Sequence, residues 1–345
     1  MSALKLDVNL GVEGNYLKDV RRTSRAADEL GFSGIVSSET KHDGFIPLAL
    51  AADATEKLDL LTSVAIAFSR SPMEAAQTAW DLQSLSDGRF ILGLGTQVKA
   101  HVTRRFSMPW DRPVARLRDY ILAVQAIWGS FQSEGPLKYE GEFYQHTLMT
   151  PFFNPGPVEH PKIPIYIAGV NTALARLAGE VSDGFHVHPF HSPDYLRQVV
   201  KPAIAEGAGK AGRSEEEIKL AVPVFVITGE DERQLEEQRR AMRQQTAFYA
   251  STPTYRTVLE VHGWGEVGER LSGLAREKKW AEMPTLITDE MLAAFAVEGA
   301  PDEIGPALAA RYGGLVDRLA LYMPYVPGER DEFWQSVISD VTRET

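Results

Sequence analysis

The chain has 345 residues, of which 44% are hydrophobic and 24% charged, a composition typical of a globular protein with a sizeable core. The net charge of -11 and the absence of a basic cluster argue against nucleic-acid binding, since a phosphate backbone attracts concentrated Lys and Arg. The sequence has no cysteine, which excludes disulfides, thiolate zinc sites, iron–sulfur clusters and cysteine nucleophiles.

The sequence also lacks targeting and membrane signals. Its first residues lead directly into a strand-like stretch without a basic and apolar leader, and its most continuous apolar run, residues 60–68, is too short to span a bilayer. We therefore expect a cytoplasmic protein, without membrane or nucleic-acid partners, that acts on a small-molecule substrate.

Strand-like and helix-like segments alternate along the chain, which is the pattern of βαβ units around a parallel sheet. Residues 4–10 alternate as a strand, and apolar residues then recur at helical spacing from Leu17 to Leu30, where Gly31 offers a stop. A second strand is expected over residues 32–36. After a polar loop and a helix over about residues 47–57, a third is expected over residues 58–67.

The third helix has the clearest start signals in the chain. Ser71 suits the N-cap, Pro72 the first helical position, and Glu74 the place of a capping-box carboxylate. It should end near Gly88, before a fourth strand over residues 89–95. The helix that follows has one apolar stripe, formed by Leu117, Ile121, Val124, Ile127 and Trp128.

The alternation resumes after an excursion over residues 137–160, whose Gly, Pro and aromatic residues predict a hairpin plus a loop. Helices are expected after Asn171, which suits an N-cap, after Ser192, after Thr228 and at the end of the chain. The remaining strands are predicted over residues 162–168, 184–188, 218–228 and 315–323. These eight strands predict an α/β fold, a (β/α)8 TIM barrel.

Two features depart from a simple repeat. Pro223 lies inside the seventh predicted strand, where it removes a ladder hydrogen bond and predicts a bulge. Residues 251–299 fit no repeat, and we expect them to form an insertion over one end of the barrel, because long additions to this fold usually lie on the active-site loops. No linker divides the chain, so a single domain over residues 1–345 is predicted.

Three stretches resemble the luciferase-like monooxygenase superfamily, and most of all its branch that uses the deazaflavin coenzyme F420 in place of a flavin. They are LKLDVNLGVEG from residue 4, TSVAIAFSRSPMEAAQTAWDLQSLSDGRFILGLGT from residue 62 and IPIYIAGVNTALARLAGEVSDGF from residue 163. The resemblance implies a barrel of the bacterial luciferase-like type. It also implies hydride transfer between F420 and an unidentified small organic substrate, a homodimer, and a flavin or F420 reductase as a further partner.

A phosphate is expected at the turn Ala168-Gly169-Val170-Asn171. The turn joins a strand to a helix start, which offers free backbone N–H groups and a helix dipole to an anion. From the residues alone, a plain turn with a glycine for tight packing fits equally well, and it is the resemblance that favours the cofactor phosphate.

The cofactor ring is expected beside the third and fourth strands. Relatives have a non-proline cis peptide behind the central ring, which by alignment falls between Ser63 and Val64. Val98 stands where a dinucleotide-binding fingerprint would need a further glycine, so that motif is excluded. Gly95 and Thr96 are instead expected to form a tight turn at the end of the fourth strand, near the cofactor ring.

The loop after the second strand holds Glu39 and His42, a carboxylate and an imidazole three residues apart, which we expect to transfer protons. A solvated polar loop is the alternative. The resemblance places a catalytic histidine or acid in this loop and a pocket carboxylate at Glu13. The sugar-phosphate dehydrogenase branch has a histidine where this chain has Glu39, and a glutamate where it has Gln97-Val98-Lys99, so oxidation of a sugar phosphate is disfavoured.

The substrate pocket is expected to include His101, Trp110, His186 and His188. The pair Arg104-Arg105 could instead hold an anionic tail of F420. His186 and His188 lie on one strand face, a spacing that can bind zinc as in hydrolase barrels. Such pairs usually end the first strand rather than the sixth, so we expect no metal.

Three other functions compete with F420-dependent hydride transfer. An FMN-dependent monooxygenase would consume oxygen, a zinc hydrolase would contain metal, and a non-catalytic flavin-binding protein would bind tightly without turnover.

Overall fold

Eight parallel strands close into a barrel in the computed structural model, which describes residues 4–11 and 16–343. Each strand pairs with the next, and the last pairs with the first. In ring order they are β1 (Lys5–Asn9), β2 (Gly34–Ser37), β3 (Asp59–Thr62), β5 (Phe90–Gly95), β8 (Ile165–Gly169), β9 (Gly184–Val187), β10 (Lys219–Thr228) and β12 (Arg318–Leu321). The predicted (β/α)8 barrel is confirmed, with strand bounds shifted by a few residues.

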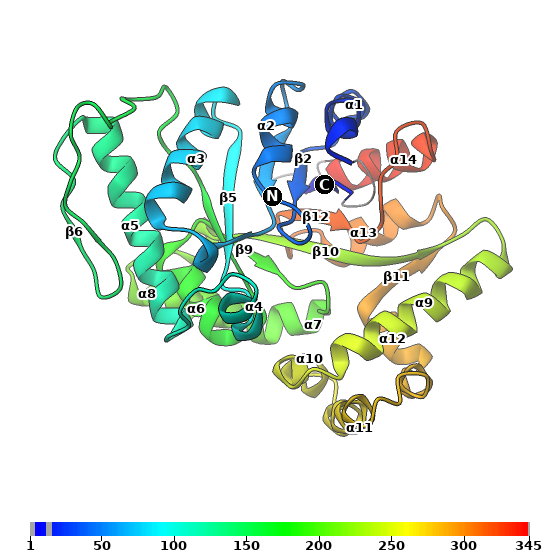
Figure 1. Cartoon of the computed structure of the whole chain (residues 1–345). Coiled ribbons are helices and arrows are strands. Elements are labelled where there is room, and N and C mark those ends of the chain that lie inside the picture. The colour runs from blue at the N-terminus through cyan, green and yellow to red at the C-terminus, as the bar shows by residue number, and fades with distance from the viewer. Residues whose placement is uncertain (1–3, 12–15, 344–345) are drawn as a thin grey trace.

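A ring of helices covers the outside of the barrel (Figure 1). Its members are α1 (Tyr16–Leu30), α2 (Ile46–Ala52), α3 (Pro72–Leu85), α5 (Pro113–Ser133), α6 (Thr172–Val181), α8 (Lys201–Lys210), α13 (Ile304–Tyr312) and α14 (Asp331–Thr342). Among the described residues, no helix combines the length and the apolar character needed to cross a membrane.

Shorter elements connect the strands to this ring. They are the 3-10 turns η1 (Ala67–Ser69) and η3 (Glu215–Glu217), the helices α4 (Lys99–Arg104) and α7 (Pro193–Tyr195), and the π-helical turn η2 (Leu196–Val200), which leads into α8. The predicted hairpin is present as β6 (Tyr139–Glu140) paired antiparallel with β7 (Gln145–His146).

Two helices begin where their capping residues predict. The Ser71 hydroxyl accepts a hydrogen bond from the Glu74 amide at 3.1 Å, and Pro72 opens α3. The Asn171 side chain accepts from the Leu174 amide at 3.0 Å and opens α6. Each cap satisfies an amide that the first helical turn leaves without a partner, so local sequence fixes these starts.

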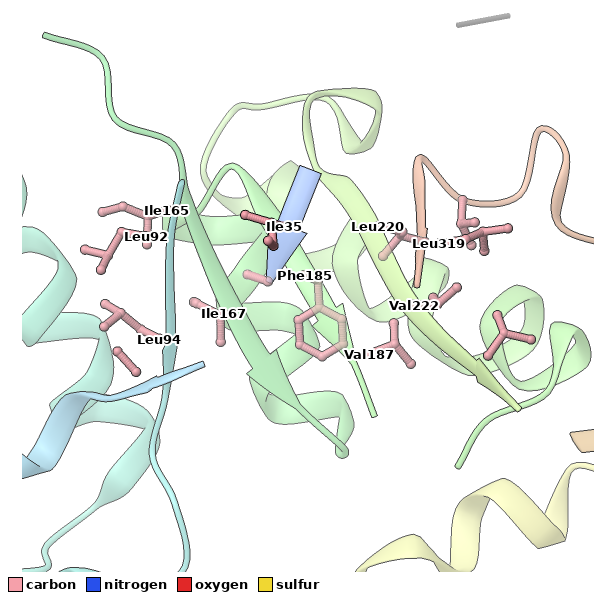
Figure 2. Close-up of a cluster of buried hydrophobic side chains, with 14 of the residues drawn as sticks. Ile35, Leu92, Leu94, Ile165, Ile167, Phe185, Val187, Leu220, Val222 and Leu319 are labelled. Carbon is pink, nitrogen blue, oxygen red and sulfur yellow. The ribbon is translucent and has the colours of Figure 1, made fainter. Parts of the chain in front are cut away.

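Alternate strand residues face two different environments, because side chains of a strand point to opposite sides in turn. Outward residues pack under the helices and form the main hydrophobic core, and Figure 2 shows ten of them by name. The inward neighbours Val36, Leu61, Ile91, Tyr166 and Ala221 form a separate small cluster inside the barrel. The apolar packing that closes the barrel from within is therefore limited to a small cluster.

The third predicted strand is broken in two. Leu61 pairs with Ile91, and after the break Ala65 in β4 (Ala65–Ile66) pairs with Leu94. Between these two pairs the third strand therefore contains one residue more than its neighbour. This is a β-bulge, and the Thr62 hydroxyl bridges it by accepting from the Gly93 amide and donating to the Gly93 carbonyl, both at 2.8 Å.

The seventh strand, β10, continues without the bulge predicted at Pro223. Its register with β12 is unbroken from Ala221 to Val224, and Pro223 lies opposite Ala320. On its other side the pairing with β9 ends at Ala221. The prediction of a bulge was wrong because Pro223 comes after the last residue of β10 that pairs with β9, so no ladder hydrogen bond is lost there.

The outer half of β10 leaves the barrel and carries the segment predicted as an insertion. There β10 pairs in parallel with β11 (Ala296–Gly299). Between these two strands lie α9 (Glu232–Ala250), η4 (Pro253–Tyr255), α10 (Arg256–Glu260), α11 (Gly265–Arg276), η5 (Met283–Leu286) and α12 (Asp289–Phe295), which gather beside the barrel (Figure 1).

One helix of the ring is not where the sequence predicts it. The helix expected after Thr228 is α9, but it packs on η5, α11 and α12 rather than in the ring. The place between the seventh and eighth strands is taken by α13, which packs against α14. The excursion from the repeat therefore begins before residue 251.

Candidate active site

A cavity of about 910 Å³ opens at the carboxyl ends of the barrel strands. Enzymes with this fold place their active sites at this end of the barrel. All eight strands or the residues that follow them contribute to its wall, which includes Asn9, Ser38, Ser63, Gly95, Ala168, His188, Pro223 and Tyr322.

A buried ion pair forms the floor of the cavity. Arg318 donates to both carboxylate oxygens of Asp7, from Nε at 2.7 Å and from Nη2 at 2.6 Å, and also to Asp59 at 2.6 Å. Gly34 leaves room for the pair, since a Cβ there would lie 2.6 Å from atoms of both partners. The charges therefore compensate one another and hold the first and eighth strands together.

The bulge of the third strand forms one wall. The peptide between Ser63 and Val64 is cis, as the resemblance implied. The Ser38 hydroxyl donates to the Ser63 carbonyl at 2.7 Å, which fixes the bulge from the second strand. Gly95 lets the Val64 side chain lie close, because a Cβ at Gly95 would be 2.7 Å from Val64 Cγ2. Thr96 also lines the cavity.

The predicted phosphate turn, Ala168 to Asn171, also lines the cavity, at the start of α6. The Tyr195 hydroxyl donates to the Val170 carbonyl at 2.7 Å and so fixes the turn. A Cβ at Gly169 would lie 2.5 Å from the Leu174 Cβ, so this glycine is needed for packing against its own helix. Packing alone explains Gly169, and the phosphate role stays a prediction.

The loop after β2 is arranged differently from the prediction. Glu39 is not in the cavity wall, and its carboxylate accepts from both Nη atoms of Arg70, at 2.7 and 2.8 Å, and from the Ile66 amide at 2.7 Å. His42 is exposed and likewise absent from the wall. Glu13 lies outside the described residues. The proton-transfer roles stay predictions, while the structure shows Glu39 holding the strand that follows the bulge.

Of the residues expected around the substrate, Trp110 lines the cavity and His101 does not. Trp110 packs edge to face on Phe68, with ring centroids 5.9 Å apart. His101 is exposed on α4. Arg105 is also exposed, and it donates to the Thr40 carbonyl beside the cavity mouth.

His186 and His188 both line the cavity, at different depths. His186 is buried, and its Nε2 atom has no hydrogen-bond partner among the described residues. The residues that the structure describes contain no group of three or more His, Cys, Asp or Glu arranged to hold a metal ion.

His188 contacts a tyrosine that the sequence gave no reason to select. The His188 Nδ1 atom accepts from the Phe190 amide at 3.1 Å, and its Nε2 atom lies 3.2 Å from the Tyr255 hydroxyl. Tyr255 comes from the insertion and lines the cavity. This segment therefore supplies part of the cavity wall.

The model of one protein family, luciferase-like monooxygenase, matches residues 3–318. The chain belongs to this family. An uncharacterized protein of Mycobacterium tuberculosis is 43% identical over 340 residues, covering 99% of this chain and 98% of the relative.

Two further comparisons involve proteins described as F420-dependent. A putative coenzyme F420-dependent oxidoreductase of M. tuberculosis is 27% identical over 334 residues, covering 89% of this chain and 92% of the relative. In structure, the coenzyme F420 dependent tetrahydromethanopterin reductase from Methanopyrus kandleri superposes with a TM-score of 0.76 at 21% identity, covering 99% of each chain. The structural likeness supports the luciferase-like fold.

This luciferase-like barrel should lose stability in mild acid. Burial lowers the pKa of His186 to about 3, and of His188 and His191 to about 4. In the unfolded chain these imidazoles titrate near 6.5. Below about pH 6.5 the unfolded chain thus binds protons that the folded chain does not, so the free energy of unfolding falls as the pH is lowered.

Urea unfolding between about pH 7.5 and pH 5 tests this expectation, since most carboxyl groups stay ionised in that window. A His186→Gln variant should show a weaker pH dependence than the wild type, whatever its stability at neutral pH. Unfolding free energies that stay constant across the window in the wild type would contradict the expectation.

Proposed function

We propose that this protein is an oxidoreductase that binds coenzyme F420 in the cavity and transfers a hydride between it and a small organic substrate. Two observations support this. Sequence blocks of the F420-using branch fall on the cavity wall, at residues 63–64, 95–96 and 168–171. A relative described as F420-dependent aligns over 89% of the chain.

The residues around the cavity fit a tricyclic ring with a phosphorylated side chain. The ring would be supported from one side by the bulge, with Ser63 and Val64, and by Gly95 at the end of β5. The backbone amides of the first turn of α6 have no hydrogen-bond acceptor within the helix, and they would bind a phosphate. When bound, the deazaflavin supplies the two-electron chemistry, and the barrel orients the reactants and excludes water.

An FMN-dependent monooxygenase is the second candidate, and the family description favours it. It would use reduced flavin and oxygen. Oxygen consumption distinguishes the two, because a deazaflavin reacts poorly with oxygen.

We expect the purified protein to bind F420 more tightly than FMN in parallel fluorescence titrations. A Val170→Asp variant should weaken F420 binding about 10-fold or more, because a carboxylate at the turn repels a phosphate in a site partly shielded from water. Val170→Asn is the matched control, since it has almost the same shape without the charge, and it should bind nearly as the wild type does.

Preferential binding of FMN, with oxygen consumption, would replace the proposal by the monooxygenase. Binding of neither cofactor would overturn both. Gly169 variants are unsuitable for this test, because a side chain there meets Leu174 whether or not a phosphate binds.

A further inference from the structure

The contact between His188 and Tyr255 fixes the direction in which the tyrosine hydroxyl can donate. His188 Nδ1 accepts the Phe190 amide, so a neutral ring has its proton on Nε2. That Nε2–H then donates to the Tyr255 oxygen across 3.2 Å. The phenolic proton of Tyr255 is left available for a molecule in the cavity.

The two rings are also held in place by packing. Their centroids are 4.6 Å apart, and Tyr249 packs edge to face on both rings, at 4.7 Å from His188 and 6.1 Å from Tyr255. Burial keeps the pKa of His188 low and raises the pKa of Tyr255. At neutral pH the imidazole is therefore neutral and the phenol protonated, which are the states that this hydrogen-bond direction requires.

Tyr255 lies away from the wall assigned to the cofactor ring, because it contacts His188, which follows a strand three places round the barrel from the bulge. In a closed ring of eight strands the third and seventh face one another. The bulge belongs to the third strand, whereas Tyr255 belongs to the segment inserted after the seventh. A substrate between them would have the ring on one side and the tyrosine hydroxyl on the other.

The charges around the cavity do not favour a strongly anionic substrate. Among the described residues of the wall, Asp7 and Arg318 neutralise each other at the floor, and Lys99 is exposed at the rim. The remaining described wall is apolar, aromatic or uncharged polar. A phosphate or carboxylate on the substrate would find no buried cation without a partner there.

We propose that the substrate is an uncharged, largely apolar carbonyl compound or the matching alcohol, and that Tyr255 is the catalytic residue that donates a proton to its oxygen. His188 is a positioning residue that orients the Tyr255 hydroxyl. This inference rests on the proposed function and names the substrate class of the same site.

Reduction of the carbonyl group would add a hydride to its carbon and a proton to its oxygen. If a reduced deazaflavin were bound in the cavity, its hydride would form a C–H bond at the carbonyl carbon. The π electrons of the C=O bond move to oxygen, which takes the proton of Tyr255, and the phenolate regains a proton from water in the open cavity. The carbonyl compound is reduced by two electrons and the deazaflavin is oxidised by two. The reverse path oxidises the alcohol.

The first test measures binding without cofactor, using acetophenone as a neutral probe and ligand-observed NMR titration. Tyr255→Phe should weaken acetophenone binding about 5-fold to 10-fold, because one hydrogen bond is lost. Ethylbenzene, which has no carbonyl, should bind equally to both proteins. Tyr325→Phe is the matched control, since Tyr325 packs on Phe32 and Trp334 and is absent from the cavity wall.

The second test follows reduction of acetophenone by reduced F420. Tyr255→Phe should lower kcat about 100-fold or more, as expected for loss of a general acid. His188→Leu should lower kcat similarly, whereas His188→Gln should restore part of it, because the glutamine amide can still donate to Tyr255. A merely structural role for His188 would not give this rescue.

The outcomes separate the two levels of the proposal. Failure to bind F420, together with Tyr255-dependent binding of acetophenone, would refute the cofactor and leave the carbonyl site supported. Tight F420 binding with no effect of Tyr255→Phe on either measurement would overturn this inference alone. Tighter binding of benzoate than of acetophenone would also overturn the substrate class.

Discussion

We expect the Gly93→Ala variant to be destabilised by about 3–5 kcal/mol and to lose the shape of the cavity wall. A Cβ at Gly93 would lie 1.8 Å from the Thr62 carbonyl oxygen and 2.9 Å from His186 Nε2. The carbonyl belongs to the backbone of the bulge and cannot move aside as a side chain would. Both hydrogen bonds between the Thr62 hydroxyl and Gly93 would be disturbed at once.

Urea unfolding of the variant and the wild type measures this cost. Gly129→Ala is the control, because a Cβ there meets no atom within 4 Å and Gly129 lies inside α5. That change should stabilise the protein by about 0.5–1 kcal/mol through helix propensity. If Gly93→Ala unfolded at the same urea concentration as the wild type, the close approach of the two strands would not be as described.

The second large effect is expected for Arg318→Met, which should cost about 3–5 kcal/mol. The substitution leaves the Asp7 carboxylate, which is 3% exposed, without its charged partner on the cavity floor. Asp59 would keep its contact with Lys5 and is less affected. The loss arises from an unpaired buried charge.

The double variant Asp7→Leu/Arg318→Met separates the charge effect from simple loss of packing. Removing both charges should recover much of the stability that the single change loses, since two apolar side chains leave no unpaired ion. Glu206→Gln, in an exposed pair with Arg176, should change the stability far less than Arg318→Met does. A double variant as unstable as the single one would show that the ion pair itself is required.

The regular parts of the fold were predictable because their signals are local. Ser71 and Asn171 cap the helices that they were expected to cap, since each bond joins residues three positions apart. The α13 helix was missed because it is short and has Gly305 and Pro306 near its start, which disguise the helical period. The cis peptide between Ser63 and Val64 was anticipated from the resemblance, not from strand periodicity.

The contacts that shape the site were less predictable because they join distant residues. Asp7 and Arg318 are separated by 311 positions, although both occupy inward places on strands, a signal that alternation could have exposed. Glu39 pairs with Arg70, which is 31 positions away in the sequence. Without knowledge of that partner, the position of Glu39 in the loop suggested a role in proton transfer and not a structural ion pair. Tyr255 lies in the segment without a repeat, and only the folded chain brings it to His188.

The long strand β10 connects two parts of the protein, the barrel and the inserted helices, whose sequences can change in evolution to different degrees. Its inner half is locked into the barrel by β9 and β12, while its outer half and β11 hold the inserted helices. Mutations or exchanges in that segment can alter Thr254 and Tyr255 at the cavity without changing a single barrel pairing. Substrate preference can therefore change in evolution through the inserted segment. The barrel wall that is proposed to hold the cofactor need not change with it.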